Sequence, residues 1–378
     1  MLGGGPAGSV TALLLARAGV SAILIEASDY RDARLGETLP PLINPLLNRL
    51  ELANRFSAQQ PCVSEGVISM WGQGRPSIND FMFDVHGSGW RIDRARFDRM
   101  LADSAADAGA DVRPARVVSC GRSRNAGWSV TFTTAHQTGS CEAALLVDAT
   151  GRSGTAGLSQ LSLKTVYDRL IGVAWFGGCT SDEPHALIES VDEGWFYSAA
   201  MPDGRIAVVY MTDSDLYRRG CARCQDFWFK QLAKTTMTRR RFAPRESRAA
   251  LRIQSAASIL RRKPAGEGWL AVGDAAMSFD PLSGLGVYRA LEGASIAATT
   301  ILDVLSRGRP RGDNHSYDRW VRRTFAEYLG LRRHHYTAEQ RWPDSTFWRR
   351  RHEPLHPSKS VKSRMGARTS SIRASSSS

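Results

Sequence analysis

The 378-residue sequence has little cysteine, little lysine and no long hydrophobic run. Because no segment approaches the roughly 18 consecutive apolar residues of a membrane-spanning helix, we predict no membrane span. We expect no secretory signal, because the glycine-rich segment begins at residue 3. Six cysteines in a chain of this length do not form a disulfide framework, which favours reduced thiols and a cytoplasmic location. Cys221 and Cys224 form a lone CxxC pair, which is weak evidence for zinc, so we predict no metal site.

The excess of positive charge lies largely at the carboxyl end. Residues 349–378 hold six Arg and two Lys against one acid, Glu353, so this segment contributes +7 of the net +13 and leaves +6 for the rest. It is rich in serine and poor in apolar residues, so we expect a disordered basic tail over 349–378. A solvated tail accounts for the charge, and we predict no nucleic-acid partner.

The first glycines of the chain form a pattern typical of dinucleotide binding. Gly3, Gly5 and Gly8 open a helical run of apolar residues, and a short apolar strand over 22–25 then ends at Glu26. The first glycine permits a tight turn, the second lets a pyrophosphate approach the backbone, and the third lets the helix pack on the sheet. The free N–H groups of the helix start attract phosphates, and the acid accepts hydrogen bonds from ribose hydroxyls.

Only Met1 and Leu2 precede this motif, where a full strand is expected. The first strand of such a fold lies in the middle of its sheet. We therefore expect a truncated first strand. We also expect the chain to be less stable than one with a longer strand, because a central strand forms cross-strand pairs on both sides.

Further strands and turns follow along the chain. The segments that stand out are residues 145–151, residues 172–211, residues 270–276 and residues 281–305. The first is an apolar strand that ends in an acid and a glycine turn. The second alternates with a period of two, as in an antiparallel sheet, with a hairpin turn at 202–204. The third is a buried strand with Asp274 at its carboxyl end, and the fourth is a loop followed by a long apolar helix from about residue 287.

Three of these blocks resemble the flavoprotein monooxygenase and FAD-dependent halogenase superfamily. They are Gly-Gly-Gly-Pro-Ala-Gly at 3–8 with Glu26, Val-Asp-Ala-Thr-Gly at 147–151, and Gly-Asp-Ala-Ala at 273–276 followed by Pro-x-x-Gly-x-Gly at 281–286. The resemblance implies an α/β fold. It consists of a doubly wound (Rossmann-like) FAD domain, an inserted antiparallel-sheet substrate domain and C-terminal helices. FAD is the cofactor that it implies.

Other segments resemble narrower groups. Gly-Glu-Thr-Leu-Pro at 36–40 is similar to the GE[ST]xxP segment of the tryptophan-halogenase-like branch. Residues 89–98, residues 194–198 and Arg341-Trp342 resemble a subgroup related to the flavoproteins that mature cysteine tryptophylquinone amino-acid oxidases.

These blocks imply a division of the chain. We expect a discontinuous FAD-binding domain of residues 1–55, 95–160 and 267–305, a substrate domain of residues 56–94 and 161–266, C-terminal helices over 306–348, and the tail. The resemblance also implies the cofactor-binding residues. They are Gly3, Gly5, Pro6, Ala7 and Gly8 at the pyrophosphate, Glu26 at the ribose, Arg94 at a helix start, Asp274 at the ribityl chain, and Pro281, Gly284, Leu285 and Gly286 at the flavin ring.

Two further features of the site can be argued from the residues. The loop at 284–286 opens a helix, whose N–H groups and dipole can stabilise the negative charge of reduced flavin. Trp195 and Tyr197 lie two residues apart on one strand face, where they either stack on an aromatic substrate or belong to the core. We assign no catalytic residue.

The sequence departs from the halogenase pattern at two points. The halogenase branch carries a WxWxIP segment, and residues 195–202 lack its second Trp and its Ile-Pro. It also carries an early lysine that holds hypohalous acid, whereas the first lysine here is Lys164. Arginine cannot replace that amine, because its delocalised group does not form a chloramine.

We therefore expect an FAD-dependent oxidoreductase, a monooxygenase that acts on an aromatic, tryptophan-like group. The substrate is a small aromatic molecule or a tryptophan of a partner protein. The alternatives are an FADH2-dependent halogenase and a flavin-binding maturation partner with little turnover. Because no second glycine motif is present, NAD(P)H binds transiently or a separate flavin reductase supplies the electrons.

Overall fold

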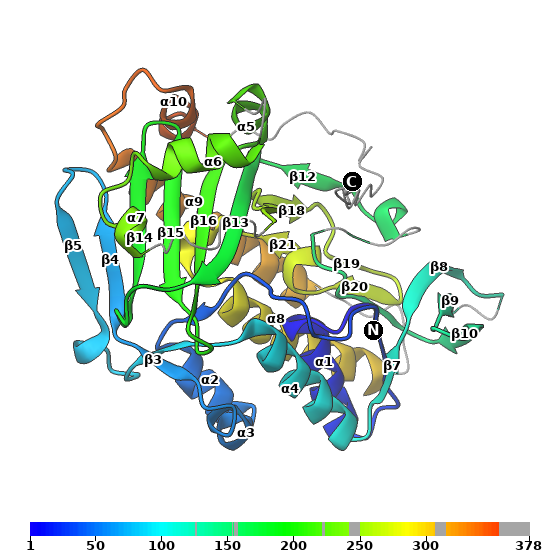
Figure 1. The fold of residues 1–378 in the computed structure, drawn as a ribbon. Coiled ribbons are helices and arrows are strands. Elements are labelled where there is room, and N and C mark those ends of the chain that lie inside the picture. The colour runs from blue at the N-terminus through cyan, green and yellow to red at the C-terminus, as the bar shows by residue number, and fades with distance from the viewer. Residues whose placement is uncertain are drawn as a thin grey trace, which may run out of the picture.

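Two sheets of different construction organise the molecule (Figure 1). The computed structural model describes residues 1–124, 127–152, 154, 158–220, 224–241, 250–306 and 315–354. One sheet is mostly parallel and is covered by helices, and the other is large and mostly antiparallel. This is the α/β architecture expected for an FAD domain with an inserted sheet.

The first sheet contains the amino-terminal residues of the chain. Its strands are β7 (Asp111–Pro114), β1 (Ile23–Glu26), β11 (Leu146–Asp148), β20 (Trp269–Ala271) and β19 (Ala265–Gly266). β1 pairs with β7 and β11 pairs with β20, both in parallel. Leu2 connects the two pairs, because it forms parallel bridges to Ile25 and to Asp148. The first residues therefore lie in the middle of the sheet, as expected.

Three helices pack beside this sheet. They are α1 (Pro6–Arg17), α4 (Arg94–Asp107) and α8 (Gly286–Ser306). α1 lies between the other two and contacts both (Figure 1). Apolar side chains at helical spacing, such as Val10, Leu13 and Leu291, are buried in the core of this domain. Asp93 caps α4, since its side chain accepts hydrogen bonds from the N–H groups of Ala95 and Arg96, at 2.8 and 3.2 Å.

Short elements complete this part of the molecule. They are α2 (Ile43–Arg49) and α3 (Ala53–Ser57), the antiparallel sheet of β8 (Arg116–Arg122), β9 (Trp128–Thr133) and β10 (Thr138–Ala143), the sheet of β12 (Lys164–Val166), β18 (Ile259–Arg261) and β21 (Met277–Ser278), the sheet of β2 (Thr38–Leu39), β6 (Gly89–Arg91) and β3 (Cys62–Ser64), and the 3₁₀ turns η1 (Phe81–Phe83), η2 (Leu158–Gln160), η4 (Gly273–Ala275) and η5 (Pro281–Ser283).

The second sheet has seven strands. In spatial order they are β17 (Arg252–Ser255), β13 (Leu170–Gly178), β16 (Arg205–Asp213), β15 (Gly194–Ala200), β14 (His185–Val191), β4 (Gly66–Met70) and β5 (Pro76–Asp80). β15 and β16 are antiparallel neighbours joined by the turn predicted at 202–204. Both stretches assigned to the substrate domain thus contribute strands to one sheet. The exact domain boundaries stay a prediction.

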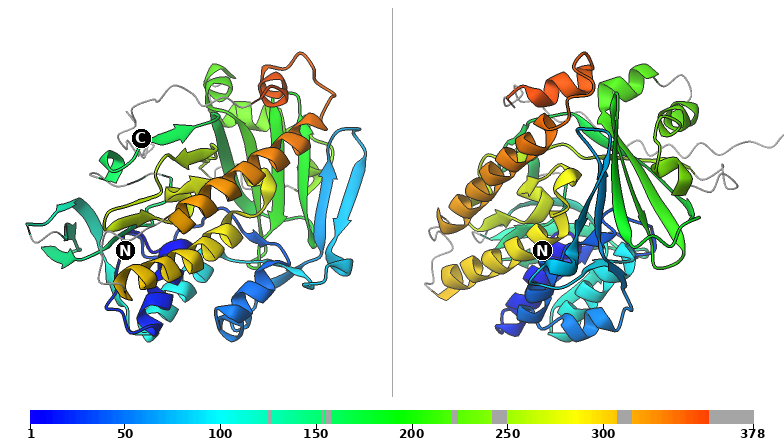
Figure 2. Two further views of the ribbon diagram at one scale, coloured as in Figure 1. Left: turned by 180° about the vertical axis from the view of Figure 1, so that it is seen from behind. Right: turned by 90° about the vertical axis from the view of Figure 1, so that its left-hand side faces the viewer.

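The two faces of this sheet are covered differently (Figure 1). The short helix α5 (Ser214–Gly220) follows β16 at the end of the sheet and contributes Leu216 and Tyr217 to the cores on the two faces. The helices α6 (Cys224–Leu232) and α7 (Thr238–Arg241) lie on the outer face. There Trp228 of α6 packs on Phe196 of β15, with ring centroids 5.9 Å apart. The inner face packs against α9 (His315–Thr337) and α10 (Thr346–His352), drawn in orange in Figure 2, through Trp195, Tyr336 and Trp348.

The carboxyl-terminal prediction needs a correction. Residues 349–352 belong to α10 and are not part of a disordered tail. Arg350 and Arg351 bind Asp213 at the end of β16, at 2.7 and 2.8 Å, and this pairing explains how an arginine-rich segment becomes ordered. The rest of the predicted tail, from residue 355, lies outside the described residues, as does Cys221.

Candidate functional site

The glycines at the start of α1 differ in the space around them. A Cβ on Gly3 would lie 2.4 Å from the Ala149 carbonyl oxygen, and one on Gly8 would lie 2.0 Å from the Gly3 carbonyl oxygen. Gly5, the N-cap of α1, has no atom within 4 Å of its Cβ position. Gly3 and Gly8 are therefore required by packing, whereas Gly5 leaves open space at a helix start. That space fits the pyrophosphate of FAD.

Glu26 is held beside this turn. Its Oε2 accepts a hydrogen bond from the Gly4 N–H at 2.5 Å, and its Oε1 accepts one from the Ser28 N–H at 2.8 Å. The Tyr30 hydroxyl donates to the Gly4 carbonyl at 2.8 Å. A carboxylate has about four acceptor positions, so Glu26 retains capacity for ribose hydroxyls.

Asp274 lies in η4, which adjoins the start of α1. A Cβ on Gly273 would lie 2.8 Å from the Ala7 Cβ, so the two motifs are in direct contact. The Asp274 carboxylate pairs with Arg152 at 3.0 Å, and Arg152 also donates to the Phe279 carbonyl at 2.7 Å. Sequence reasoning did not assign Arg152 to the site. Its position directly after the turn at 147–151 was the available signal.

The loop expected at the flavin ring, residues 281–286, is called the flavin loop; it consists of η5 and the start of α8. Asp280 begins η5 by accepting a hydrogen bond from the Leu282 N–H at 3.0 Å. Gly284 has φ +63°, a left-handed conformation that favours glycine. Pro281, Gly284 and Gly286 are exposed, so their backbone is open to a bound ring. The helix start of α8 follows directly, as the sequence predicts.

Asp280 is anchored from α9, an element whose part in the site the sequence did not reveal. Its backbone N–H donates to the Tyr328 hydroxyl at 2.8 Å. Its Oδ2 accepts hydrogen bonds from the Tyr336 hydroxyl at 2.7 Å and from Arg332 Nε at 3.2 Å. Burial raises the pKa of Asp280 even though Arg332 opposes this shift.

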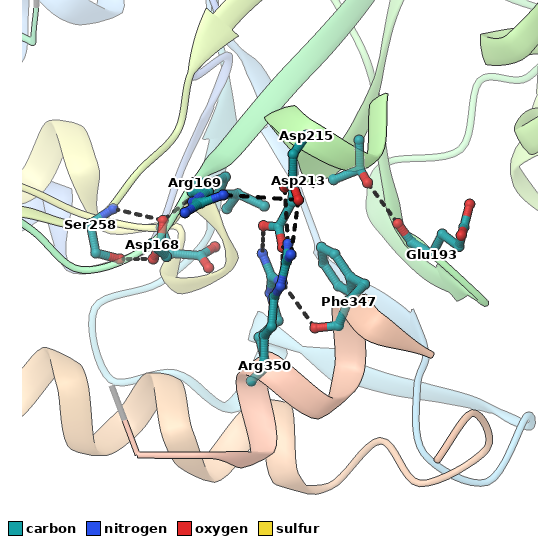
Figure 3. A network of polar contacts seen from close by, with 12 residues as sticks. Asp168, Arg169, Glu193, Asp213, Asp215, Ser258, Phe347 and Arg350 are labelled. Atoms are coloured by element: carbon teal, nitrogen blue, oxygen red, sulfur yellow. Dashed lines mark hydrogen bonds and ion pairs between the residues drawn. The ribbon is translucent and has the colours of Figure 1, made fainter. Parts of the chain in front are cut away.

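This anchor continues into a buried network of ion pairs (Figure 3). Arg332 also pairs with Asp168 at 3.3 Å, and Asp168 accepts a hydrogen bond from the Ser258 hydroxyl at 2.6 Å. Figure 3 also shows Asp213, which binds Arg350. Arg351 pairs with Asp213 as well, and it lies over the ring of Tyr336, as Arg332 does. The network thus connects the flavin loop, α9 and the end of β16.

Trp195 and Tyr197 both lie on the inner face of the seven-stranded sheet, but they differ in how deeply they are buried. Trp195 is 1% exposed, and its Nε1 donates to the Tyr336 hydroxyl at 3.0 Å. It therefore lies in the core, which was one of the two possibilities. Tyr197 is half-buried, and its hydroxyl lies 3.0 Å from the Thr38 Oγ1. It clusters with Leu282 of the flavin loop.

Glu37 lies beside Tyr197 and is 0% exposed. Its Oε2 accepts a hydrogen bond from the Gly36 N–H at 2.8 Å. Burial raises the pKa of Glu37, and this effect outweighs the Gly36 N–H, the Tyr197 hydroxyl and Arg94, which all lower it. A carboxyl group with a raised pKa in such a place is typical of sites that transfer protons.

Arg94 holds the segment that carries Glu37. Its Nη1 donates to the Leu35 carbonyl at 2.8 Å, and its Nη2 pairs with Asp98 at 3.1 Å. A Cβ on Gly36 would lie 2.4 Å from Arg94 Nη1, so the two residues pack tightly. The contact between Arg94 and the cofactor stays a prediction.

The lysines in the described part of the chain lie on other elements. Lys164 of β12 approaches the Arg152 carbonyl at 3.3 Å, and Lys234 pairs with Asp192 at 2.6 Å. Lys230 lies on α6 and Lys263 follows β18. Among the described residues, no cluster of three or more His, Cys, Asp or Glu side chains could hold a metal ion. No helix within the described ranges is both long and apolar enough to cross a membrane.

Comparison with known proteins gives one family. A family model described as tryptophan halogenase matches residues 75–377. LodB of Marinomonas mediterranea, by name an FAD-dependent oxidoreductase, is 30% identical over 361 residues, which are 93% of this chain and 96% of LodB. Tryptophan 2-halogenase of Chondromyces crocatus is 25% identical over 81% of this chain, and the chain spans only 61% of that halogenase.

Solved structures agree with the family match. CmlS, a flavin-dependent halogenase, has a TM-score of 0.82 and 25% identity, over 93% of this chain and 66% of CmlS. QhpG, a peptidyl tryptophan dihydroxylase essential for tryptophylquinone cofactor biogenesis, has a TM-score of 0.74 and 26% identity, over 93% of this chain and 77% of QhpG.

Proposed function

Because the chain belongs to the tryptophan halogenase family, a family of flavin-dependent enzymes with FAD as cofactor, we propose that it oxidises an aromatic ring bound between Tyr197 and the flavin loop. The observation that carries this proposal is the half-buried Tyr197, which clusters with Leu282 of that loop and lies beside the buried Glu37. Aromatic and carboxyl groups beside a flavin loop suit a planar, electron-rich ring.

The residues of the chain bind and orient the cofactor in this proposal. Gly5 and the start of α1 hold the pyrophosphate, Glu26 holds the ribose, and Asp274 with Arg152 holds the ribityl chain. The start of α8 stabilises negative charge on the reduced ring. When bound and reduced, FAD supplies two electrons and activates O2. NADH or NADPH bound transiently, or a separate flavin reductase, supplies those electrons.

Halogenation is the first candidate reaction. The family match, the tryptophan 2-halogenase and CmlS all favour it over the monooxygenase hypothesis that the sequence led us to. Only the coarser part of that hypothesis, a flavin-dependent oxidoreductase, is confirmed.

Oxygenation is the second candidate, and the placement of lysine favours it. The early lysine of the halogenase branch is missing from the sequence, and the described lysines lie on other elements than β2, β15 and the flavin loop. The likeness to QhpG supports a tryptophan of a partner protein as the substrate of such a reaction. The cytoplasmic location stays a prediction.

One assay separates these candidates. The purified protein is incubated with FAD, NADH, a flavin reductase, O2 and bromide, together with tryptophan or a tryptophan-containing peptide. Mass spectrometry then distinguishes a bromine from an oxygen on the indole ring. A product of either mass supports the proposal and selects the reaction. Bound FAD without either product contradicts it and favours a maturation partner with little turnover.

A further inference from the structure

One carboxylate oxygen of Glu37 is buried and accepts no hydrogen bond from the described residues. Oε2 accepts a hydrogen bond from the Gly36 N–H, but Oε1 is buried and has no hydrogen-bond partner among the described residues. Burial of a polar atom without a hydrogen-bond partner is unfavourable, because the atom has lost its contacts with water. Such an atom in a site that binds a reactant calls for a functional explanation.

The backbone around Glu37 is fixed on both sides, so the side chain stays where it is. The Glu37 carbonyl accepts a hydrogen bond from the Ile92 N–H at 2.7 Å. Thr38, the next residue, pairs with Arg91 in the sheet of β2 and β6. On the other side Gly36 has φ +97°, where a larger side chain would meet Arg94. Glu37 is therefore held at the base of the site.

Tyr197 of β15 lies beside Glu37 and packs in the cluster that includes Leu282 of the flavin loop. Its hydroxyl contacts Thr38, the residue after Glu37, and Tyr197 is only partly buried, unlike Trp195. Burial and the charge of Glu37 raise the pKa of Tyr197 well above its ordinary value. Tyr197 therefore stays neutral near pH 7, where it can pass a proton on without keeping it.

The charged groups that face this pair come from two elements, α4 and α7. Arg94 at the start of α4 lowers the pKa of Glu37, and Arg241 of α7 lowers the pKa of Tyr197. Neither arginine outweighs the effect of burial. The pair is thus arranged to hold a proton reversibly.

We propose that Tyr197 and Glu37 form a proton relay that takes the proton leaving the aromatic ring of the substrate. This inference rests on the proposed function, since both candidate reactions replace a ring hydrogen. Tyr197 contacts the substrate, and Glu37 acts through Tyr197.

The step balances in both reactions. A bond forms between the ring carbon and an oxygen or halogen atom, and the C–H bond then breaks and returns its electron pair to the ring. The proton passes to the Tyr197 oxygen as the Tyr197 O–H proton passes to Glu37 Oε1. The overall change is ArH + O2 + FADH2 → ArOH + H2O + FAD for oxygenation. It is ArH + X⁻ + H⁺ + O2 + FADH2 → ArX + 2 H2O + FAD for halogenation.

Kinetics with ring-deuterated tryptophan, free and in a peptide, test the relay. Glu37→Gln and Tyr197→Phe should slow product formation by about 10²-fold or more, the usual contribution of a positioned base. Both should also give a primary isotope effect that the wild type lacks, because proton removal becomes rate-limiting. Reoxidation of the reduced flavin by O2 should keep its wild-type rate.

The pH profile gives a readout that a merely structural role would not change. Glu37 must be ionised to accept the proton, so the wild-type rate should rise with pH through a pKa above the ordinary 4.5 of glutamate. The rate of Glu37→Gln should no longer rise with pH in this way, and Glu37→Asp should restore part of the pH dependence. Glu65→Gln, a change at an exposed acid before β4, serves as the control. A Glu37→Gln enzyme with wild-type rate and pH profile would overturn the relay.

Infrared spectroscopy tests the pair without any substrate. The flavin-loaded wild type should show the C=O band of a protonated carboxyl group that titrates above pH 4.5, the ordinary value for glutamate. This band should vanish in Glu37→Gln and shift in Tyr197→Phe. A missing band, or one insensitive to Tyr197→Phe, overturns the relay even if the wild type forms product. A band that behaves as expected, in a protein that forms no product, contradicts the proposed function instead.

Discussion

At the scale of single residues, the three glycines at the start of α1 have different physical roles. Gly3 has φ +103°, a conformation that L side chains rarely adopt. Gly8 lacks room for a Cβ, whereas Gly5 has open space around it. A change at Gly5 should therefore affect the ligand and a change at Gly8 should affect the fold.

Substitution separates these two roles. Gly5→Val should keep the melting temperature of the flavin-free protein and lose most of the bound FAD, because the new side chain occupies the space for the pyrophosphate. Gly8→Ala should lower the melting temperature itself, since overpacking costs about 1–3 kcal/mol. Calorimetry without flavin and the 450 nm absorbance after loading measure the two effects. Wild-type flavin occupancy in Gly5→Val would show that the pyrophosphate lies elsewhere.

Motifs with a fixed spacing along the chain can be predicted from the sequence, whereas contacts between distant segments cannot. The turn at 3–8, the acid Glu26 and the loop at 281–286 were found because spacing along the chain encodes them. Arg152 was missed because its partners, Asp274 and the Phe279 carbonyl, lie more than 100 residues away along the chain. Glu37 was quoted within a motif, but nothing in the sequence shows that its side chain is buried.

At the scale of elements, α9 positions the flavin loop through Asp280. Tyr336 donates to Asp280 and accepts from the indole N–H of Trp195. One hydroxyl therefore connects the loop, the helix and the seven-stranded sheet. The sequence could place α9 among the C-terminal helices, but it could not show that α9 supports the loop.

Removal of this hydroxyl should weaken flavin binding. Tyr336→Phe leaves the Trp195 N–H without its partner and takes a donor from Asp280, and a hydrogen bond to a charged group is worth about 1.5–3 kcal/mol. We expect the Kd for FAD, measured by flavin fluorescence, to rise about 10- to 100-fold. Tyr210→Phe is the matched control, because that buried hydroxyl donates to the Glu193 carbonyl. Equal Kd values for the two variants would exclude a specific effect on the loop.

α10 shows why an arginine-rich segment was taken for solvated tail. Arg351 is 2% exposed, and burial of its charge is offset by Asp213 at the end of β16. Composition reports the charge of a segment, but it does not report the partner that allows that charge to be buried. Phe347 and Trp348 add buried rings to the same helix.

Truncation can test this assignment. A chain that stops after residue 352 should keep its melting temperature and its flavin. A chain that stops after residue 345 should lose several kcal/mol of stability, since removal of a buried aromatic side chain alone costs about 3–5 kcal/mol. Chemical denaturation of both chains measures the difference. If the two chains were equally stable, α10 would contribute nothing to the fold.

At the scale of the whole molecule, buried ion pairs connect the seven-stranded sheet to the C-terminal helices. Burial alone would raise the pKa of Asp213, but Arg351 and Arg350 outweigh this and hold it below its ordinary value. A hydrogen bond from Arg350 is the main cause that lowers the pKa of Asp215 to about 2. These carboxyl groups bind fewer protons in the folded state than in the unfolded chain.

Stability should therefore depend on pH in the acid range. The stabilisation from these carboxylates is complete above the unfolded pKa of about 3.8 and is lost as pH falls toward 2. Asp213→Asn should cost roughly 3–5 kcal/mol at pH 7, because it leaves buried arginine unpaired. Asp213→Asn should also reduce the loss of stability at acid pH, as measured by chemical denaturation at several pH values. Asp103→Asn, at an exposed ion pair, should change stability by at most about 1 kcal/mol and serves as the control.

The position of Leu2 in the middle of the first sheet has a consequence for synthesis of the chain. Leu2 pairs with β1 and β11, and β11 pairs with β20, so this sheet needs residues as far along as Ala271. A ribosome adds about 5–20 residues per second, so roughly tens of seconds pass between the synthesis of α1 and that of the last strand of its sheet. The inserted antiparallel sheet is complete earlier, at Ser255. The nascent chain should therefore order the insert first, while the apolar face of α1 stays available to chaperones.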